Sequence, residues 1–555
     1  MKTNIYNKAK GLVKVLPFYL FTLLSLMTSC GEDFLTEEPA SQLPLDGYYT
    51  TEARVQEAMV AAYDPMHWFD YFNGWAPLYI VWDSQGDDIY VGGGSTGDQS
   101  QLHLISQYKS DPNNSIGGAW STAYSGINRS IRLIEDAENC EELSDATRKQ
   151  YIAEGRTLRA WYYLVLWKIW GNVPFYMDNL TFPYVTPQLS ADEVYSNIAA
   201  DLEEVLDGGA LPMKQPDEWA GRMTQAAAAM IYADYVMYQK DQNRYQKALG
   251  YMEQVISSSK YRLLAGADYD DLFKYETEYN DEIILDVDYF AKGGRRDWGS
   301  ANAPGGTVTP ALIGIDGLSY HGAAWEFNTG GWGFCTVSKE VYDAYDEGDL
   351  RRDIGILNFD KYMEDKWNNE GIQVTYGGRY QNTGYFLRKY LGRPGGNEGN
   401  VASGDLNWGN NLHLYRYAET LLNAAELALE TGNTAKAQGY FDQVRQRAGV
   451  ATKTVSKDNL IDERRLEFVG EGKRYFDLVR SGKAASVLKA GGGVVMQSKR
   501  TFNAAGTGFE GQCTWGGQAI PERQGWTENK KYIPIPQGEI EACASTDYPL
   551  TQNPY

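Results

Sequence analysis

Two glutamates lie one helical turn apart in a segment where paired carboxylates could perform acid–base chemistry. Glu463 and Glu467 are four positions apart in the stretch ERRLEF, so they share one face of a helix. A general acid must hold a proton near neutral pH, but Arg464 and Arg465 lie beside them, and nearby positive charge keeps carboxylates ionised. We therefore predict that these glutamates form a structural ion network and not a catalytic pair.

Other spacings that would indicate catalysis or metal binding do not occur in the sequence. The four histidines form no HExxH motif or other tight ligand spacing, and no GxSxG elbow is found. Asp268, Asp270 and Asp271 lack the spacing of an EF-hand loop, so we interpret them as a helix cap, with a structural calcium ion as the alternative. The sequence thus predicts no catalytic residue, no metal site and no cofactor, with that calcium ion left open.

The composition and charge exclude several classes of partner. The chain has 555 residues and a formal net charge of −22, which argues against binding to nucleic acid or electrostatic docking onto anionic lipid. A neutral ligand fits such a surface best. The chain has 41 Tyr and 15 Trp against 18 Phe, and these two residue types suit half-wet ligand sites because their rings are apolar and their tips polar.

The N-terminus predicts export and lipidation. Four lysines precede an apolar run, Val15 to Met27, which has the length of a signal peptide and is short for a membrane span. Small residues before Cys30 resemble a bacterial lipobox, so residues 1–29 are predicted to be a signal peptide and Cys30 the lipidated end. A plain secreted protein is the alternative. The acidic residues Glu32 and Asp33 resemble the signal for the outer face of the outer membrane, although they could simply be a polar tether.

The four remaining cysteines show no CxxC spacing, so a zinc site is not expected. Export would permit a disulfide between Cys513 and Cys543, but the sequence cannot show that they are close, and the pairing is left open.

Helical periodicity organises most of the chain into one domain, residues 51–555. Residues 30–50 are predicted to be a tether and the segment that leads into the fold. Residues 51–261 and 412–482 form a mainly α frame with tetratricopeptide-like helix pairs, and the charged stretch 460–480 continues it as one helix. Residues 262–411 are a large irregular, loop-rich insertion with a few short strands, and residues 483–555 are a variable C-terminal region. Within the frame we predict helices over residues 52–63, 119–138, 146–170, 191–206, 223–239 and 244–256.

Several separated motifs, in this order, resemble the SusD/RagB family. They begin with the lipobox ending at Cys30 and close with QNPY at the C-terminus. Between these lie GRTLRAWYYLVLWKIWGNVPF (155–175), GDLRRD (348–353), RKY (388–390), LYRYAETLLNAAELAL (414–429), VRQRAG (444–449), ERRLEFVGEGKRYFDLVR (463–480) and YIPIPQGEI (532–540). Each motif alone is weak, but their order is specific to the family and spans nearly the whole mature chain.

The resemblance implies a fold and a role. Members of this family are outer-membrane lipoproteins with an α-helical frame that capture oligosaccharides at the cell surface. They act as lids on a SusC-like TonB-dependent transporter and are not enzymes. Two alternatives are kept. One is a surface glycoside hydrolase, because the 73 acidic residues could supply two carboxylates although no pair stands out. The other is a relative that captures peptides.

Aromatic residues outside the family motifs are the candidate ligand site. A flat Trp or Tyr ring can cover the apolar C–H face of a sugar, and a few directed hydrogen bonds then fix its orientation. The alternative is that the rings merely pack loops onto the frame, as helical spacing predicts for Trp161, Trp167 and Trp170. Our candidates for glycan binding are Trp68, Tyr71, Asn73, Trp75, Trp82, Asp83, Asp88, Trp298, Trp325 and Trp332.

Overall fold

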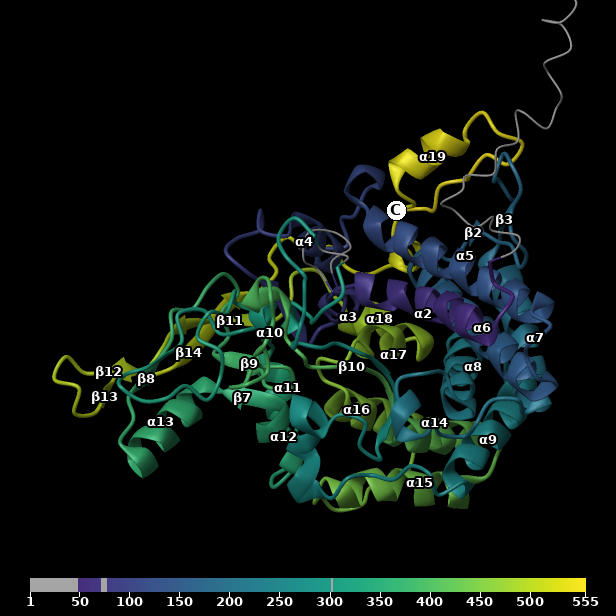
Figure 1. Ribbon diagram of the computed structural model, residues 1–555. Coiled ribbons are helices and arrows are strands. Elements are labelled where there is room, and N and C mark those ends of the chain that lie inside the picture. Colours follow the sequence, from purple (N-terminus) through teal and green to yellow (C-terminus); the bar gives the residue numbers. More distant parts are fainter. Residues whose placement is uncertain (1–47, 71–76, 301–302) are drawn as a thin grey trace, which may run out of the picture.

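Helices dominate the computed structural model, which describes residues 48–70, 77–300 and 303–555 (Figure 1). The predicted fold class, mainly α with a loop-rich insertion and short strands, is confirmed. The predicted leader and Cys30 lie outside the described residues.

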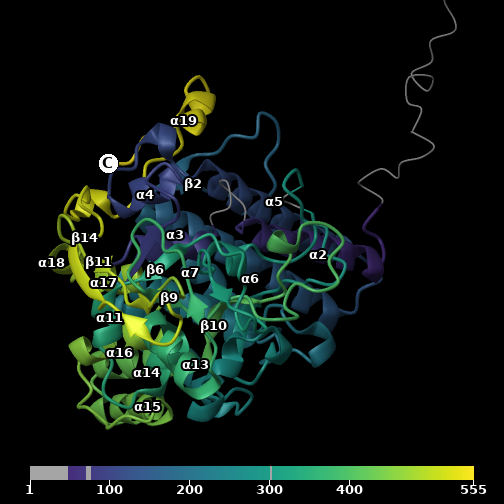
Figure 2. The same cartoon turned by 90° about the vertical axis from the view of Figure 1, so that its left-hand side faces the viewer.

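The frame is a continuous series of helices in which each packs on the next (Figures 1 and 2). The pairs α5–α6, α8–α9 and α14–α15 are helical hairpins. The series closes across the insertion, because α14 packs against α9 although about 160 residues separate them. Its members are α2 (Glu52–Trp68), α5 (Gly117–Asn139), α6 (Asp145–Trp170), α7 (Ala191–Gly208), α8 (Gln225–Gln239), α9 (Gln242–Ser257), α14 (Tyr417–Glu430) and α15 (Thr434–Arg447).

The tryptophans of α6 lie in the core, as predicted. Trp161, Trp167 and Trp170 are between 0% and 3% exposed. The Nε1 of Trp167 donates to the carbonyl of Ala191 at 2.9 Å, and that of Trp170 to the carbonyl of Pro534 at 3.1 Å. These bonds satisfy indole groups that would otherwise be buried without a partner.

Helix α2 continues five residues beyond its predicted end at Tyr63 and passes through Pro65. Proline has no backbone N–H, so Pro65 leaves the carbonyl of Ala61 without its helical donor. The side chain of Arg129 from α5 supplies one, because its Nη1 donates to that carbonyl at 3.0 Å. The helix therefore continues through Pro65 to Trp68.

The predicted charged helix is in fact two helices, α16 (Lys457–Glu467) and α17 (Arg474–Arg480). Gly470 and Gly472 take φ values of +76° and +71° between them, a conformation that side-chain-bearing residues rarely adopt. Upstream, residues 412–416 form strand β10 (Leu412–Arg416) and not the start of a helix. This strand pairs antiparallel with β4 (Ile283–Val287) and so attaches the insertion to the frame.

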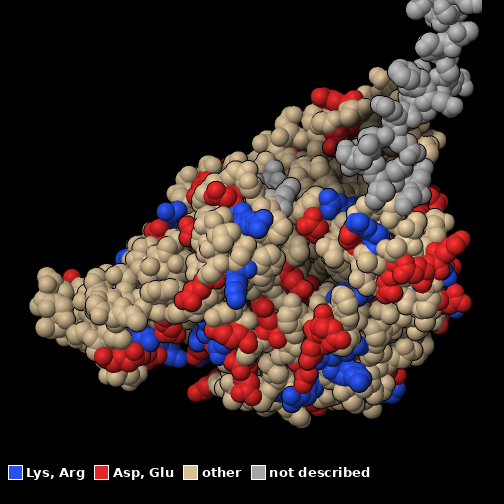
Figure 3. All heavy atoms as spheres, in the orientation of Figure 1, with Lys and Arg blue, Asp and Glu red and all other residues tan. Residues whose placement is uncertain are grey.

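Three strands of the insertion join β1, which comes from residues 89–92 before it, in a four-stranded antiparallel sheet of order β1-β6-β9-β7. An arm of short hairpins extends from this part of the molecule, and its tip carries few charged side chains (Figures 1 and 3). The strands of the sheet are β1 (Ile89–Gly92), β6 (Phe334–Val337), β9 (Tyr385–Leu387) and β7 (Ile356–Asn358), and those of the arm are β11 (Val494–Ser498), β12 (Thr501–Phe502), β13 (Phe509–Glu510) and β14 (Thr514–Gln518).

Short elements complete the fold. The helices are α3 (Leu78–Ser84), α4 (Ser100–Ser106), α10 (Thr309–Leu312), α11 (Lys339–Asp343), α12 (Leu350–Gly355), α13 (Phe359–Glu370), α18 (Ala484–Val487) and α19 (Gln537–Cys543). The strands are β2 (Val173–Pro174), β3 (Gln188–Leu189), β5 (Ser319–Tyr320) and β8 (Val374–Thr375). Within the described ranges, no helix is both long and apolar enough to span a membrane. Cys513 and Cys543 are free thiols, so the disulfide left open above is not formed.

The predicted ion network is present and buried. Glu467 accepts from Arg416 of β10 at 3.1 Å and from Arg351 of α12 at 3.0 Å, and Arg447 of α15 also contacts it. Glu471 pairs with Arg416 at 2.8 Å and with Lys389 at 2.6 Å. The carboxylates are at most 2% exposed. The surrounding cations outweigh the effect of burial and hold the pKa of Glu467 well below its usual range, so it is not a general acid.

We expect Glu471→Gln to destabilise the protein by about 3–5 kcal/mol, because Arg416 and Lys389 would keep their charge without its counter-charge. In the folded protein the pKa of Glu471 is lowered to about 2. A group with a lowered folded pKa stabilises above its unfolded pKa, about 4.3, and this stabilisation is lost as pH falls towards 2. Thermal unfolding should therefore separate wild type and variant clearly at pH 7 and much less at pH 3.

Glu253→Gln is the matched control, because Glu253 pairs with Lys436 at the surface, where side chains are 30% and 49% exposed. A change within about 0.5 kcal/mol is expected there. Equal losses in the two variants at pH 7 would contradict the special role of the buried network.

Candidate functional site

A buried ion pair joins the two regions that hold most of the predicted aromatic site. Asp70 follows α2 directly, and Arg296 lies two positions before Trp298. Their side chains are 0% and 1% exposed, and Nη1 of Arg296 lies 2.9 Å from Oδ2 of Asp70. Arg296 also donates to the carbonyls of His67 at 2.7 Å and Gly306 at 2.6 Å. The pair therefore fixes the loop that carries Trp298 against the end of α2.

Asp70 is itself held by several donors. It accepts from the hydroxyl of Thr307 at 2.7 Å and from the backbone N–H of Val308 at 2.8 Å. Burial raises the pKa of Asp70, and Arg296 together with these donors opposes that shift by stabilising the ionised form. Arg295 donates from its N–H to the carbonyl of Pro304 at 2.9 Å, so residues 295–300 and 303–306 are the two described sides of a hairpin. Asp70 holds both sides, through Arg296 on one and Thr307 and Val308 after the other.

The side-chain amide of Asn407 holds the hairpin from its buried side. Asn407 is fully buried, and its Oδ1 accepts from the backbone N–H of Arg296 at 3.2 Å. Its Nδ2 donates to the carbonyl of Arg296 at 2.8 Å and to that of Ser403 at 2.6 Å. A Cβ on Gly305 would lie 2.3 Å from the same Oδ1, so only glycine lets the hairpin approach this closely.

The hairpin presents Trp298 next to Trp332. The ring centroids are 5.7 Å apart and the ring planes are inclined by 31°. Trp298 is 53% exposed, whereas Trp332 is half-buried against Val308 and Leu406. The pair is therefore an exposed aromatic surface with one anchored ring, and we call these two residues the tryptophan platform.

Close backbone packing holds Trp332 in place. Its N–H donates to the carbonyl of Ala311, in α10, at 2.9 Å. A Cβ on the preceding residue, Gly331, would lie 2.0 Å from the carbonyl carbon of Gly314, so the two chains pass each other at backbone contact. A ring fixed on such a support loses little conformational freedom when it binds a ligand.

Polar groups border the platform. Arg379 donates from Nη1 to the carbonyl of Trp332 at 3.1 Å and from Nε to Asp316 at 2.8 Å. Both side chains are partly exposed, at 38% and 27%. Exposed ring faces beside such donors and acceptors suit a sugar, which has both apolar faces and hydroxyl edges. Arg379 and Asp316 are not among the residues predicted from the sequence, because they come from separate loops and carry no motif.

Three of the predicted site residues, Trp82, Asp83 and Asp88, make contacts within the fold. Asp83 is 5% exposed and accepts from the backbone N–H of Gly472 at 3.0 Å, and burial raises its pKa well above the usual range. Asp88 is 2% exposed and pairs with Arg465. Trp82 packs edge-on against Phe476 at 5.3 Å. The prediction that Asp83 and Asp88 bind ligand is corrected, since the α3–β1 region folds inward onto α16 and α17 and buries both carboxylates.

The remaining predicted residues occupy different places. Trp68 lines a cavity of about 460 Å³, and the guanidinium of Arg129 lies 4.6 Å from its ring centroid. Trp219 lines the same cavity and is 43% exposed. Trp325 is 36% exposed in the loop after β5. Tyr71, Asn73 and Trp75 lie outside the described residues.

Two of the three aspartates weighed as a calcium site, Asp270 and Asp271, are paired with cations. Asp270 binds Arg393 at 2.7 Å, and Asp271 binds Lys274 at 2.7 Å. They are not a helix cap either, because the 3₁₀-helix Gly266–Phe273 begins after Ala265. Among the described residues, no cluster of three or more His, Cys, Asp or Glu could hold a metal ion.

We expect Arg296→Met to destabilise the protein by about 3–5 kcal/mol, because Asp70 would be left buried without its counter-charge. Hydrogen exchange over residues 295–300 should rise at the same time. Arg295→Met is the matched control, since Arg295 is the exposed neighbour on the same hairpin. Similar stability and exchange in the two variants would show that the buried pair does not hold the hairpin.

Comparison with known proteins assigns the chain to a family. Residues 281–555 match the model of the SusD family, and residues 95–215 match a model described as "Starch-binding associating with outer membrane". A solved structure of surface glycan-binding protein A from Bacteroides thetaiotaomicron in complex with laminarihexaose is 40% identical, with a TM-score of 0.79, covering 91% of this chain and 100% of that one.

Two further relatives agree. A solved laminarin-binding SusD-like protein is 28% identical, with a TM-score of 0.75, covering 91% of this chain and all of that one. SusD-like protein P25 from Formosa agariphila is 27% identical over 85% of this chain and 90% of its own length. The solved relatives are named as binding proteins, and the prediction that the chain is not an enzyme is confirmed. The chain belongs to the SusD family of proteins associated with the outer membrane.

Proposed function

We propose that this protein binds oligosaccharides at the tryptophan platform and delivers them to a SusC-like TonB-dependent transporter in the outer membrane. The observation that carries the binding site is the exposed Trp298 beside the anchored Trp332. Ring faces bind a sugar by covering its apolar C–H face while its hydroxyls stay in water or meet polar neighbours.

Rigidity supports this assignment. The hairpin of Trp298 is held by the Asp70–Arg296 pair and by Asn407, and Trp332 is held by α10. Because these groups are fixed before binding, little of the binding free energy is lost in ordering them. The bordering Arg379 and Asp316 would provide hydrogen bonds to hydroxyl groups of the ligand.

Laminarin is the first ligand to test. A solved relative that is 40% identical is in complex with laminarihexaose, and a second solved relative is named for laminarin binding. Starch oligosaccharides are the second choice, since one matching family model is described as starch-binding. The acidic surface also suits a neutral glucan better than an anionic one.

We expect Trp298→Ala and Trp332→Ala each to weaken laminarihexaose binding at least about tenfold, or about 1.4 kcal/mol, because each removes a ring face from the platform. Titration calorimetry with laminarihexaose and maltohexaose would measure the loss and show which glucan is preferred. The matched control is Trp219→Ala, another exposed tryptophan, which lines the separate cavity near Trp68.

A loss confined to Trp219→Ala would move the site to that cavity. Undiminished binding in both platform variants would refute the platform. Release of reducing ends from laminarin by the wild-type protein would contradict a purely binding role.

Delivery to a transporter requires the protein to be held at the membrane, which we propose is done by lipid on Cys30 at the outer face of the outer membrane. Cys30→Ala should move the protein out of the outer-membrane fraction and abolish its co-purification with a TonB-dependent transporter. Cys513→Ala, which alters a free thiol of the folded domain, is the control. Membrane retention of the Cys30 variant would contradict lipid anchoring, and a wild-type protein purified without any transporter would contradict delivery.

A further inference from the structure

A second open cavity lies on other elements than the tryptophan platform. Its walls are α5, the loop that joins β2 to β3, and α19, and its volume is about 490 Å³. Figure 1 shows β3 and α19 far from α10, which supports the platform. A volume of this size is typical of small-ligand sites.

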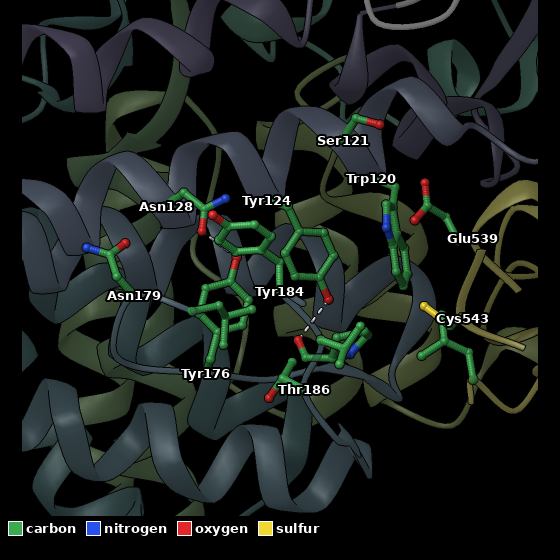
Figure 4. A pocket seen from close by; sticks show the side chains of 14 residues that line it. Trp120, Ser121, Tyr124, Asn128, Tyr176, Asn179, Tyr184, Thr186, Glu539 and Cys543 are labelled. Atoms are coloured by element: carbon green, nitrogen blue, oxygen red, sulfur yellow. Dashed lines mark hydrogen bonds between the residues drawn. The ribbon is translucent and has the colours of Figure 1, made fainter. Parts of the chain in front are cut away.

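One wall of the cavity is formed by side chains at regular spacing along α5. Trp120, Tyr124 and Asn128 follow one another at intervals of four residues, so their side chains lie along one face of the helix over roughly 12 Å. Trp120 and Tyr124 have ring centroids 5.1 Å apart, with planes inclined by 57°. The helix thus presents two rings followed by an amide, and Figure 4 shows them in this order.

The loop after β2 places a third ring, that of Tyr176, parallel to the ring of Tyr124. Tyr176 stacks with Tyr124, with centroids 6.2 Å apart and planes inclined by only 12°. Its hydroxyl donates to Oδ1 of Asn128 at 2.8 Å, and that of Tyr124 donates to the carbonyl of Pro174 at 2.8 Å. Both rings are therefore held at their polar tips, and the pocket is formed before any ligand binds.

Amide groups lie beside these rings (Figure 4). Asn128 uses Oδ1 to accept from Tyr176, and Asn179 uses Nδ2 to donate to Glu135 at 2.6 Å. Each of these exposed amides thus keeps its other end available, a donor on Asn128 and an acceptor on Asn179. A hydroxyl group can act as donor and acceptor at once, so this pair of groups matches it.

Tyr184 forms the rim of the cavity from the same loop. It is 67% exposed and has a φ of +61°, a backbone conformation that residues with a side chain rarely adopt. Its N–H donates to the carbonyl of Thr181 at 2.7 Å in a tight turn. An exposed aromatic ring held in a strained turn beside a pocket points to a role in binding.

We propose that this cavity is a second binding site for a neutral oligosaccharide, an inference that rests on the proposed glycan-binding function. Parallel tyrosine faces would cover sugar rings, and Asn128 and Asn179 would bind hydroxyl groups. Among the described residues that line it, none is Lys or Arg, and the one carboxylate is that of Glu539. An anionic ligand would therefore find no counter-charge there. A concave pocket with amide groups beside its rings suits a sugar better than it suits a flat protein surface.

The test uses the full-length Trp298→Ala variant, in which the platform is disabled. Laminarihexaose and maltohexaose are added at millimolar concentration, and hydroxyl-radical footprinting with mass spectrometry measures oxidation of Tyr176. At least one of the two sugars should protect Tyr176. Adding Tyr184→Ala or Asn179→Ala should abolish that protection, and both substitutions are at exposed positions that the fold tolerates.

Phe182→Ala is the matched control, because Phe182 is 85% exposed on the same loop and does not line the cavity. It should leave the protection intact. Absence of protection by both sugars, or equal loss with Phe182→Ala, would overturn the second site. Loss of transporter co-purification in Tyr184→Ala without any sugar protection would overturn it too and would assign the loop to protein docking. Failure of the platform proposal would be a distinct result, because that proposal is judged only by how Trp298→Ala and Trp332→Ala change glycan binding.

Discussion

The fold depends on a cluster of buried charges at the junction of α16 and α17. Glu467 and Glu471 gather Arg351, Lys389, Arg416 and Arg447 from α12, the segment after β9, β10 and α15. Ionised groups this deeply buried are costly unless each is paired, so the cluster forms only when all the contributing segments are in place. Frame and insertion are thereby tied into one unit, although the insertion has little regular structure of its own.

A second buried ion pair, between Asp70 and Arg296, fixes a surface hairpin to this rigid unit. Asp70 lies just after α2 of the helical frame and Arg296 lies on the hairpin of Trp298, and each is almost fully buried. Irregular loops can hold a binding group accurately only if their backbone polar groups find partners, and here Asn407 and Asp70 provide them. Hydrogen bonds also hold the rings of the cavity on α5, at the tips of Tyr124 from the helix and Tyr176 from the loop after β2.

The two sites differ in how they expose their rings. At the platform, one ring stands out from a hairpin beside an anchored one, which suits a chain lying across the surface. In the cavity on α5, rings line a hollow with amides beside them, which suits the end or a short stretch of a sugar chain. A binding protein with both sites could hold one polysaccharide at two places. The polysaccharide would then dissociate only when both contacts are broken at once, and its release would be slow.

The sequence by itself determined the family, the helical frame and the structural nature of the ERRLEF glutamates. Helical periodicity and ordered motifs are local or repetitive signals, and arginines adjacent to glutamates reveal an ion network without any coordinates. Tertiary structure alone decided which rings are exposed. Trp82, Asp83 and Asp88 looked like ligand groups beside a ring-rich loop, yet contacts with α16 and α17, nearly 400 residues away, bury the two carboxylates and pack the ring. Exposure depends on such long-range contacts, and so the pairing of Trp298 with Trp332 and the tyrosine-lined cavity on α5 could be seen only in the folded chain.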